Sequence, residues 1–435
     1  MLEAHQSPVD QHRRSAPRDL VMVGDGRFRV HTQAYVSPEV FTQEMRQIFS
    51  TQWVYLAHSS ELPAPGDYKT THMGLQPVIV SRGDDGVVNV MLNRCVHRGA
   101  VVCRDQRGSA NFFRCPYHGW VYGRDGKLTG VSMRGGDNGY GADFEQPDGL
   151  KVVPRVDSYR GLIFASMDPE APDLREYLGR ATELIDGKLD QSPVGEIRLV
   201  SQPYVSRYQG NWKFAAENIV DGYHFTFVHA AFIKLQGKYG STTGDFHVHQ
   251  GHSQSEERKY RTTGQSFATR HGHGLNMKPN PTQVQLVEEA FPEYHLQLQA
   301  QHGEDLATVL GSNTASIFPN LGIIHHQIRT WRPIAPDVTE VTIYPYEVVG
   351  APDEFNQGWL RSQERFYGPA GHGMPDDVEI FALNQQGLAA DSVDWLILER
   401  GIGAEKQVDN GDYQGLASGE TPQRGLWRKW KQVMA

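Results

Sequence analysis

Two short motifs that each contain one cysteine and one histidine constrain this chain most. They read NRCVHRGA and FRCPYHGW, and they contribute Cys95, His97, Cys115 and His118. Each motif offers one thiolate and one imidazole, which are ligands for iron and zinc. The fold must therefore bring two loops, separated in the chain, together at one metal centre.

The pairing within each motif distinguishes between two kinds of centre. Two cysteines and two histidines also suit tetrahedral zinc. A zinc finger, however, usually groups cysteine with cysteine and histidine with histidine, whereas here each motif is mixed. The mixed pairing favours a Rieske [2Fe–2S] centre, in which two histidines replace two cysteines on one iron. Only Cys103 is then left over, which excludes a disulfide framework and favours a reducing, cytoplasmic setting.

Chain length and local patterns predict two domains. At 435 residues the chain exceeds the size at which one core stops growing. Short alternating runs separated by turns at 83–86 and 123–126 indicate strands, and a proline-rich break follows at 168–172. We expect an α+β protein with a small all-β Rieske [2Fe–2S] domain over 47–168. A larger α+β domain over 169–435 should carry helices on an antiparallel sheet, with an N-terminal tail and segment over 1–46 packed on it.

A second metal site is suggested by His224 and His229. Alone, two histidines at this spacing are more typical of packed or surface residues. With one carboxylate they form a 2-His-1-carboxylate triad, which leaves open positions on Fe(II) for dioxygen. The segment GPAGHGMPDDVEIF offers Asp376, Asp377 and Glu379 at the start of a predicted helix. We expect Asp376 to cap this helix and Asp377 to be the ligand.

Charge and hydropathy exclude other classes of protein. The formal net charge of −9 disfavours nucleic acid as the main partner, because such binding depends on neutralising phosphates. No run approaches the about 20 apolar residues of a membrane span. The first residues have no apolar stretch typical of a secretory signal. These features predict a cytoplasmic protein without nucleic-acid or membrane partners.

Together the motifs resemble the large (α) subunit of Rieske non-haem iron aromatic-ring-hydroxylating oxygenases. The resemblance runs from about Tyr35 to the C-terminus and includes the segments NWKFAAENIVDGYHFTFVH and PDDVE. It implies that one cluster iron is held by Cys95 and Cys115, the other by His97 and His118, and mononuclear Fe(II) by His224, His229 and Asp377. It also implies a ring of three subunits, with or without a small β subunit, because Asp221 matches an acid that links His224 to His118 of a neighbour. Asn218 matches a polar residue near the mononuclear iron.

The resemblance also implies an activity. This is cis-dihydroxylation of an aromatic ring with O2 and electrons from NAD(P)H. The electrons should arrive through a separate reductase, and a ferredoxin in some systems, since no glycine-rich dinucleotide fingerprint follows a strand here. The spacing in ENIVDGYH and the terminal GLWRKWKQVM resemble enzymes for benzoate, anthranilate, salicylate or terephthalate. Arg329 is the candidate for binding a substrate carboxylate; the alternative is an arginine on a surface strand.

Several alternatives stay open at this point. The same metals serve Rieske monooxygenases, which carry out ring monohydroxylation or oxidative demethylation. A protein of a different class would be an electron carrier that uses only the cluster. The basic C-terminal segment is expected to dock Trp427 and Trp430 on the body of the protein rather than on a membrane. The chain departs from the family pattern around five histidines, in a region that could line the entrance of the substrate pocket: His247, His249, His252, His271 and His273. His247 and His249 are expected to be polar surface residues rather than ligands of a third metal.

Overall fold

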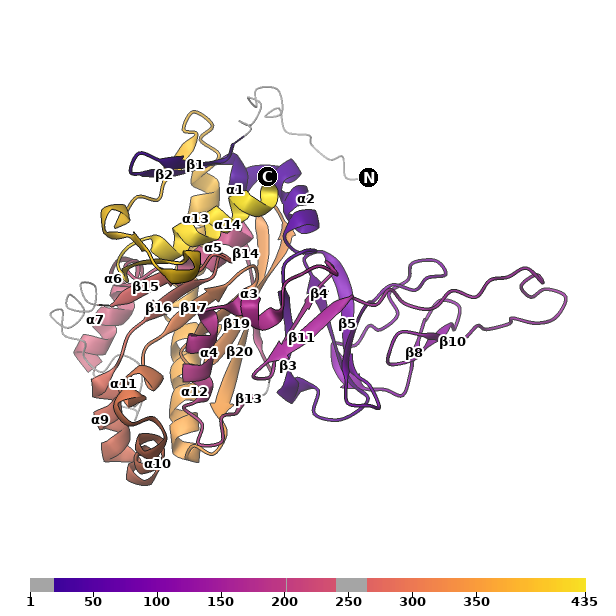
Figure 1. Ribbon diagram of the computed structural model, residues 1–435, viewed down its shortest axis with the longest axis horizontal. Helices are drawn as coiled ribbons and strands as arrows, with labels where there is room; N and C mark the ends of the chain where they lie inside the picture. The colour runs from indigo at the N-terminus through magenta and orange to yellow at the C-terminus, as the bar shows by residue number, and fades with distance from the viewer. Residues whose placement is uncertain (1–18, 201, 240–263) are drawn as a thin grey trace.

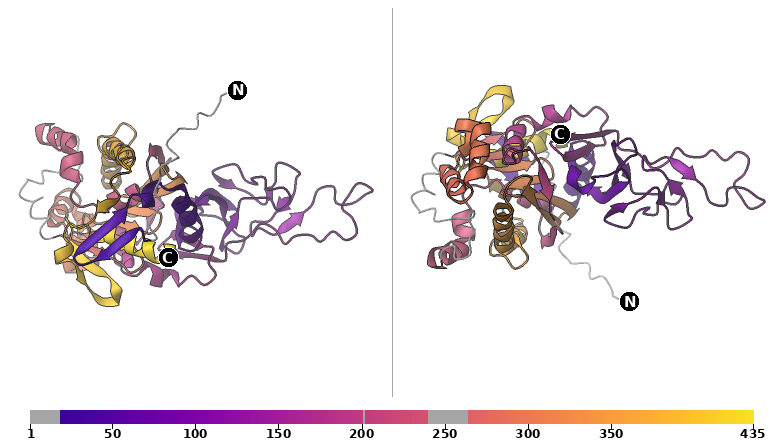
Figure 2. Two further views of the ribbon diagram at one scale, coloured as in Figure 1. Left: turned by 90° about the horizontal axis from the view of Figure 1, so that it is seen from above. Right: turned by 90° about the horizontal axis from the view of Figure 1, so that it is seen from below.

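The computed structural model of the protein describes residues 19–200, 202–239 and 264–435. A β-rich part, indigo and purple on the right of Figure 1, extends away from a larger part in which helices surround a long sheet. Both views in Figure 2 show the same elongated arrangement. The predicted α+β class, with a small all-β domain, is confirmed.

The β-rich part consists of three small antiparallel sheets. One sheet has the order β6-β5-β4-β7, a second β10-β9-β8, and a third β11-β12-β3. Their bounds are β3 (Val54–His58), β4 (Asp67–Met73), β5 (Gln76–Arg82), β6 (Val88–Leu92), β7 (Arg107–Ser109), β8 (Phe113–Arg114), β9 (Val121–Tyr122), β10 (Leu128–Gly130), β11 (Arg155–Tyr159) and β12 (Leu162–Ser166). The predicted hairpins at 83–86 and 123–126 are both present. The cysteine and histidine motifs lie in the loops between β6 and β7 and between β8 and β9.

The larger part is built on one antiparallel sheet. Its order is β13-β20-β19-β18-β17-β16-β15-β23-β22, with β14 paired to β20. The strands are β13 (Ile197–Leu199), β14 (Tyr204–Gln209), β15 (Gln265–Ala268), β16 (Gly274–Met277), β17 (Thr314–Ile317), β18 (Leu321–Ile324), β19 (Gln327–Ala335), β20 (Val338–Val348), β22 (Lys406–Gln407) and β23 (Tyr413–Leu416). Strand β20 alternates between buried and half-buried residues, as expected for a strand with one face on a core.

Helices cover this sheet. They are α3 (Leu174–Leu178), α4 (Ala181–Leu189), α5 (Trp212–Asn218), α6 (Phe225–Val228), α7 (Ala230–Tyr239), α9 (Pro281–Ala290), α10 (Pro292–His302), α11 (Leu306–Val309), α12 (Asp353–Tyr367), α13 (Met374–Gly387) and α14 (Thr421–Met434). Within the described ranges, no helix has both the length and the apolar character needed to cross a membrane.

Both ends of the described chain pack on the larger part. Strands β1 (Val21–Gly24) and β2 (Arg27–His31) form a sheet with β21 (Trp395–Ile397), and helices α1 (Gln33–Val36) and α2 (Pro38–Gln47) follow. On α14, Trp427 and Trp430 are buried, so their predicted docking on the body of the protein is confirmed. The domain boundaries at 46/47 and 168/169 stay predictions.

The structure describes only the later part of the histidine-rich segment. His247, His249 and His252 lie outside the described residues. Strands β15 and β16, however, place part of this segment in the central sheet. His273 is fully buried; its Nε2 bonds to the Tyr177 carbonyl at 2.8 Å, and its Nδ1 accepts from Phe318 N–H at 3.1 Å. Two backbone partners thus satisfy the His273 ring inside the core.

Candidate functional site: two metal centres

The two cysteine loops adopt matching turns. Cys95 N–H donates to Ala100 O and Cys115 N–H donates to Trp120 O, both at 2.8 Å. Gly99 and Gly119 have φ values of 75° and 70°, a conformation that favours glycine. Each turn thus fixes one sulfur and lets the histidine side chain project from the loop tip.

The side chains on these turns fit an iron–sulfur cluster. Cys95 and Cys115 are buried, and the rings of His97 and His118 lie 4.5 Å apart, centroid to centroid. His97 Nδ1 is buried without a hydrogen-bond partner, as expected for an atom that binds a metal. Burial raises the pKa of the Cys115 thiol, and the neighbouring Cys95 raises it further. Two neighbouring buried thiols resist ionisation on their own, and a bound iron would stabilise both as thiolates.

The same geometry argues against a single zinc ion. A tetrahedral zinc site needs its four ligand atoms within about 4 Å of one another. Among the described residues, the group of His, Cys, Asp or Glu side chains that brings three ligand atoms within 4.8 Å of one another lies elsewhere in the chain, not on these two loops. A Rieske centre divides its ligands between two irons, two thiolates on one and two imidazoles on the other, and therefore does not require all four ligand atoms to converge on one ion.

The converging group is His224, His229 and Asp377. His224 and His229 flank the short helix α6, and Asp377 lies in the first turn of α13. Asp377 Oδ1 is 3.3 Å from His229 Nε2 and 3.6 Å from His224 Nε2. The structure thus brings together the three side chains that the sequence proposed for Fe(II), and two imidazoles with one carboxylate fit that ion.

Comparison with known proteins places both sites in one family. Residues 52–136 match the Rieske [2Fe-2S] domain family, and residues 192–435 match the family described as ring hydroxylating alpha subunit (catalytic domain). The 2-halobenzoate 1,2-dioxygenase large subunit of Burkholderia cepacia is 35% identical over 86% of this chain and 80% of that protein. The toluate 1,2-dioxygenase subunit alpha of Pseudomonas putida is 35% identical over 84% and 80%. This chain is a ring-hydroxylating α subunit.

Solved structures agree with this family assignment. Naphthalene 1,2-dioxygenase from Rhodococcus sp., bound to indole, matches with a TM-score of 0.79 at 29% identity, over 93% of this chain and 94% of that one. A quaternary ammonium Rieske monooxygenase, at 19% identity and a TM-score of 0.64, shares the fold alone. The α subunit is thus an oxidoreductase of the dioxygenase class whose cofactors are a Rieske cluster and a mononuclear iron.

Each histidine of the triad has a second carboxylate at its outer nitrogen. Asp221 Oδ1 lies 3.6 Å from His224 Nδ1, and Asp376 Oδ2 lies 3.5 Å from His229 Nδ1. Asp221 also accepts from the N–H groups of Tyr223 and His224. Burial alone would raise the pKa of the Asp221 carboxyl, but His224 and these N–H groups outweigh burial and lower it. An ionised carboxylate at this point orients the imidazole.

The prediction that Asp376 caps helix α13 was wrong. The helix begins at Met374 with Gly373 as its N-cap, and Asp377 N–H already donates to Gly373 O at 3.2 Å. The helix starts earlier because proline fits its first turn, and Pro375 stands there. This start turns Asp377 inward and leaves Asp376 facing His229 from the half-exposed side.

Asn218 and Arg329 also lie near the triad. Asn218, the last residue of α5, donates from Nδ2 to Asp377 Oδ1 at 3.2 Å. The arginine of strand β19 is only 6% exposed, so the alternative of a surface arginine is wrong. The Arg329 guanidinium lies 4.2 Å from the centre of the Tyr367 ring. Phe366 beside Tyr367 contacts His229, with ring centroids 5.1 Å apart, which connects Arg329 to the triad.

Arg329 carries an unused hydrogen-bond donor. Its Nε donates to Gln327 Oε1 at 3.2 Å, while its buried Nη2 has no partner among the described residues. Burial lowers the pKa of the guanidinium, and the neighbouring Tyr367 and Asp377 counteract this. Among the described residues, no carboxylate forms an ion pair with the Arg329 guanidinium, and a buried cation without such a partner is costly.

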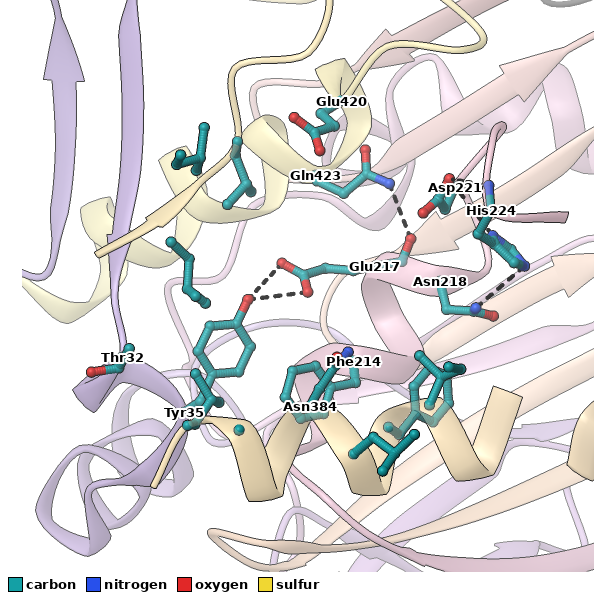
Figure 3. A pocket seen from close by; sticks show the side chains of 18 of the residues that line it. Thr32, Tyr35, Phe214, Glu217, Asn218, Asp221, His224, Asn384, Glu420 and Gln423 are labelled. Carbon is teal, nitrogen blue, oxygen red and sulfur yellow. Dashed lines mark hydrogen bonds and ion pairs between the residues drawn. The ribbon is translucent and has the colours of Figure 1, made fainter. Parts of the chain in front are cut away.

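A cavity of about 620 Å³ opens beside the triad (Figure 3), and Arg329 is not among the residues that line it. Asn218, Asp221 and His224 line it, together with the carboxylates of Glu217 and Glu420. Glu217 accepts from Tyr35 and Trp427, and burial raises its pKa to about 7. The surrounding wall includes exposed apolar side chains, namely those of Leu383, Val393 and Ile397. Sequence reasoning did not find Glu217, although it lies one helical turn before Asp221.

Proposed function

We propose that this α subunit is the terminal oxygenase of a system that dihydroxylates an aromatic carboxylate. The convergence of His224, His229 and Asp377 carries this proposal, because a triad of this kind leaves open positions on Fe(II) for dioxygen. Cys95, His97, Cys115 and His118 would hold the cluster. When bound, the two centres supply single electrons and dioxygen chemistry. Electrons would come from NAD(P)H through a separate reductase, with or without a ferredoxin.

The chain's own residues arrange this chemistry. Asp221 lies 3.6 Å from His224 Nδ1 and Asp376 lies 3.5 Å from His229 Nδ1, so that each carboxylate is placed to take up the outer N–H when Nε2 binds the metal. Asn218 holds the Asp377 carboxylate by its amide N–H. The aromatic side chains of Phe366 and Tyr367 form an apolar wall between the triad and Arg329. The proposed aromatic ring would pack against this wall, with its carboxylate toward Arg329.

The substrate proposal rests on Arg329. Its guanidinium is buried, lies over Tyr367 and has a free N–H, and a carboxylate matches such a group. The relatives named 2-halobenzoate, toluate and anthranilate dioxygenases support a substrate of this class. Oxygen consumption and product analysis with a panel of aromatic acids and unsubstituted rings test it. A cis-diol from an acid supports the proposal, whereas monohydroxylated or demethylated product would favour a monooxygenase.

The two centres are proposed to work between subunits of a trimer, with or without a β subunit. In Figure 1, strands β8 and β10 next to the cluster loops lie at one end of the chain, and α6 lies at the opposite end. Within one chain the centres are therefore far apart. A neighbouring subunit could bring its His118 to Asp221, which would join the two imidazoles through one carboxylate.

Surface chemistry supports this contact. The cluster tip exposes apolar side chains, with Tyr117 at 59% and Met133 at 90%, and Arg98 is exposed beside His97. The cavity at Asp221 offers the complement, carboxylates surrounded by apolar groups. Co-assembly of a cluster-deficient chain with a triad-deficient chain tests the arrangement, because activity returns only if the centres meet across an interface. None of the three cysteines forms a disulfide, which supports a reducing, cytoplasmic location.

A further inference from the structure

Two buried hydrogen-bond donors on strand β19 and helix α12 have no partner among the described residues. They are Nη2 of Arg329 and Nε2 of Gln363, whose residues are 6% and 1% exposed. Buried polar groups are nearly always hydrogen-bonded in folded proteins. Two such donors on facing elements therefore indicate a place where an acceptor binds.

Gln327 connects the two donors and fixes the orientation of both amides. Its Oε1 accepts from Arg329 Nε at 3.2 Å, and its Nε2 donates to Gln363 Oε1 at 2.6 Å. An arginine side chain can only donate, so its partner on Gln327 is the amide oxygen. The Gln327 NH2 group then faces Gln363, whose oxygen is the acceptor. The group that Gln363 has left over is consequently its NH2, which is a donor.

These side chains share the space between the sheet and α12. Gln327 and Arg329 are two residues apart on β19 and point to the same face of the sheet. Gln363 and Tyr367 are four residues apart on α12 and lie on one face of the helix. The Arg329 guanidinium lies over the Tyr367 ring, 4.2 Å from its centre. The aromatic residue before Tyr367 contacts a triad histidine, with 5.1 Å between ring centroids. The donors thus lie in the layer that reaches the iron site.

We propose that Gln363 is a specificity-determining residue that donates its free N–H to the carboxylate of the aromatic substrate, beside the N–H of Arg329. The inference rests on the proposed function, in which the substrate is an aromatic carboxylate. Because Arg329 Nε already donates to Gln327, the Nε–Nη2 edge of the guanidinium is not available as a pair for one carboxylate. A carboxylate accepts on both oxygens, and Gln363 supplies a second donor without a second positive charge.

The test is Gln363→Met, with benzoate as the probe and toluene as its counterpart without a carboxylate. Methionine keeps the length of glutamine and removes the amide. Kd for benzoate is measured by calorimetry on the iron-loaded protein without reductant, and KM for both probes is measured from oxygen consumption. One hydrogen bond to a charged group is lost, so Kd and KM for benzoate should rise about 10–100-fold. KM for toluene and kcat for both probes should stay at the wild-type values.

Gln363→Glu separates this contact from a purely structural role. Glutamate keeps an oxygen that accepts from Gln327 but replaces the free NH2 group with a carboxylate oxygen. Benzoate should bind more weakly than to wild type, and more weakly still as the pH rises from about 6 to about 8, because an ionised carboxylate repels the probe. Wild-type affinity for benzoate across this range would show that Gln363 only holds Gln327, and the inference would fail.

Ser362→Ala is the matched control. Ser362 precedes Gln363 on α12, is 3% exposed, and its Oγ also has no partner among the described residues. Successive helical residues point about 100° apart, so this side chain is not directed at Gln327. The variant should bind both probes like wild type. Equal losses in Ser362→Ala and Gln363→Met, or equal losses for benzoate and toluene in Gln363→Met, overturn the inference.

Failure of the proposed function has a different signature. A wild-type protein that hydroxylates none of the aromatic acids in the panel contradicts the proposed function itself. A wild-type protein that hydroxylates them, together with a Gln363→Met variant of unchanged affinity for benzoate, contradicts only the role of Gln363.

Discussion

Two adjacent carboxylates at the start of α13 give a matched test of the iron site. The Asp377 side chain is 5% exposed and points at both histidines, with Oδ1 3.3 Å from His229 Nε2. The Asp376 side chain is 39% exposed and reaches only the outer nitrogen of His229, at 3.5 Å. Asp377→Ala therefore removes the one anionic ligand, whereas Asp376→Ala removes a hydrogen-bond partner of a ligand.

The two variants should lose different amounts of Fe(II) affinity. Losing the outer partner of a metal-bound histidine typically costs about 10–100-fold in metal affinity, so Asp376→Ala should bind Fe(II) more weakly but still fill at saturation. Asp377→Ala leaves two neutral imidazoles for a dication, and its loss should exceed about 100-fold. The α13 helix itself should persist in both variants, because neither residue is its cap.

Iron analysis after anaerobic loading and dialysis provides the measurement. Wild type should retain about three irons per chain, two in the cluster and one at the triad. Asp377→Ala should retain about two and lose hydroxylation, with an unchanged cluster spectrum as the internal control. If Asp376→Ala lost the third iron while Asp377→Ala kept it, the assignment of the two acids would be reversed and the reasoning from burial would fail.

Three further predictions follow from other contacts. Asp221→Asn should keep both metal centres but slow electron transfer between them by orders of magnitude, as followed by single-turnover kinetics; wild-type rates would contradict the bridge. Arg329→Met should raise KM for aromatic acids about 10–100-fold, the value of a charge-assisted contact, without lowering Tm, and an equal effect on unsubstituted rings would refute the anchor. Burial lowers the pKa of His273 to about 3, and its hydrogen bond to Tyr177 only partly offsets this. Since the unfolded state takes up the proton near pH 6.5 and the folded state does not, stability should fall as pH drops from 7 to 5. His273→Gln should remove about 2 kcal/mol of that fall in denaturant titrations, and an unchanged slope would contradict the assignment.

The metal ligands could be predicted from sequence because local spacing determines them. In each cysteine loop the cysteine and histidine share one short turn, and His224 and His229 flank a single turn of helix. The choice of Asp377 over Asp376 agrees with the structure, but it relied on a capping role for Asp376 that the structure does not show. A helix can begin at any of several residues near Pro375, and a shift of its start rotates the facing side chain.

The burial of individual side chains was less predictable from the sequence than the identity of the metal ligands. Gln327, Ile328 and Arg329 are consecutive residues of β19, and all three are buried, because this part of the strand is covered on both faces. Alternation therefore does not reveal that Arg329 faces inward. Strand β9 has two residues, too few for any periodicity, and its pattern therefore does not reveal that the buried Tyr122 hydroxyl lies 3.0 Å from Cys95 Sγ.

The position of helix α5 depends on residues that are remote in sequence. Glu44 of α2 is fully buried and accepts from Lys213 Nζ at 2.5 Å, from Trp212 Nε1 at 2.9 Å and from Trp430 Nε1 at 2.7 Å. One carboxylate thus ties α5 to an N-terminal helix and to the C-terminal helix α14. No local pattern marks Glu44, because a glutamate on an amphipathic helix normally faces water. Its burial follows only from the cation and the two indoles that the rest of the chain brings to it, and the same contacts hold the end of α5 that carries Asn218 beside the triad.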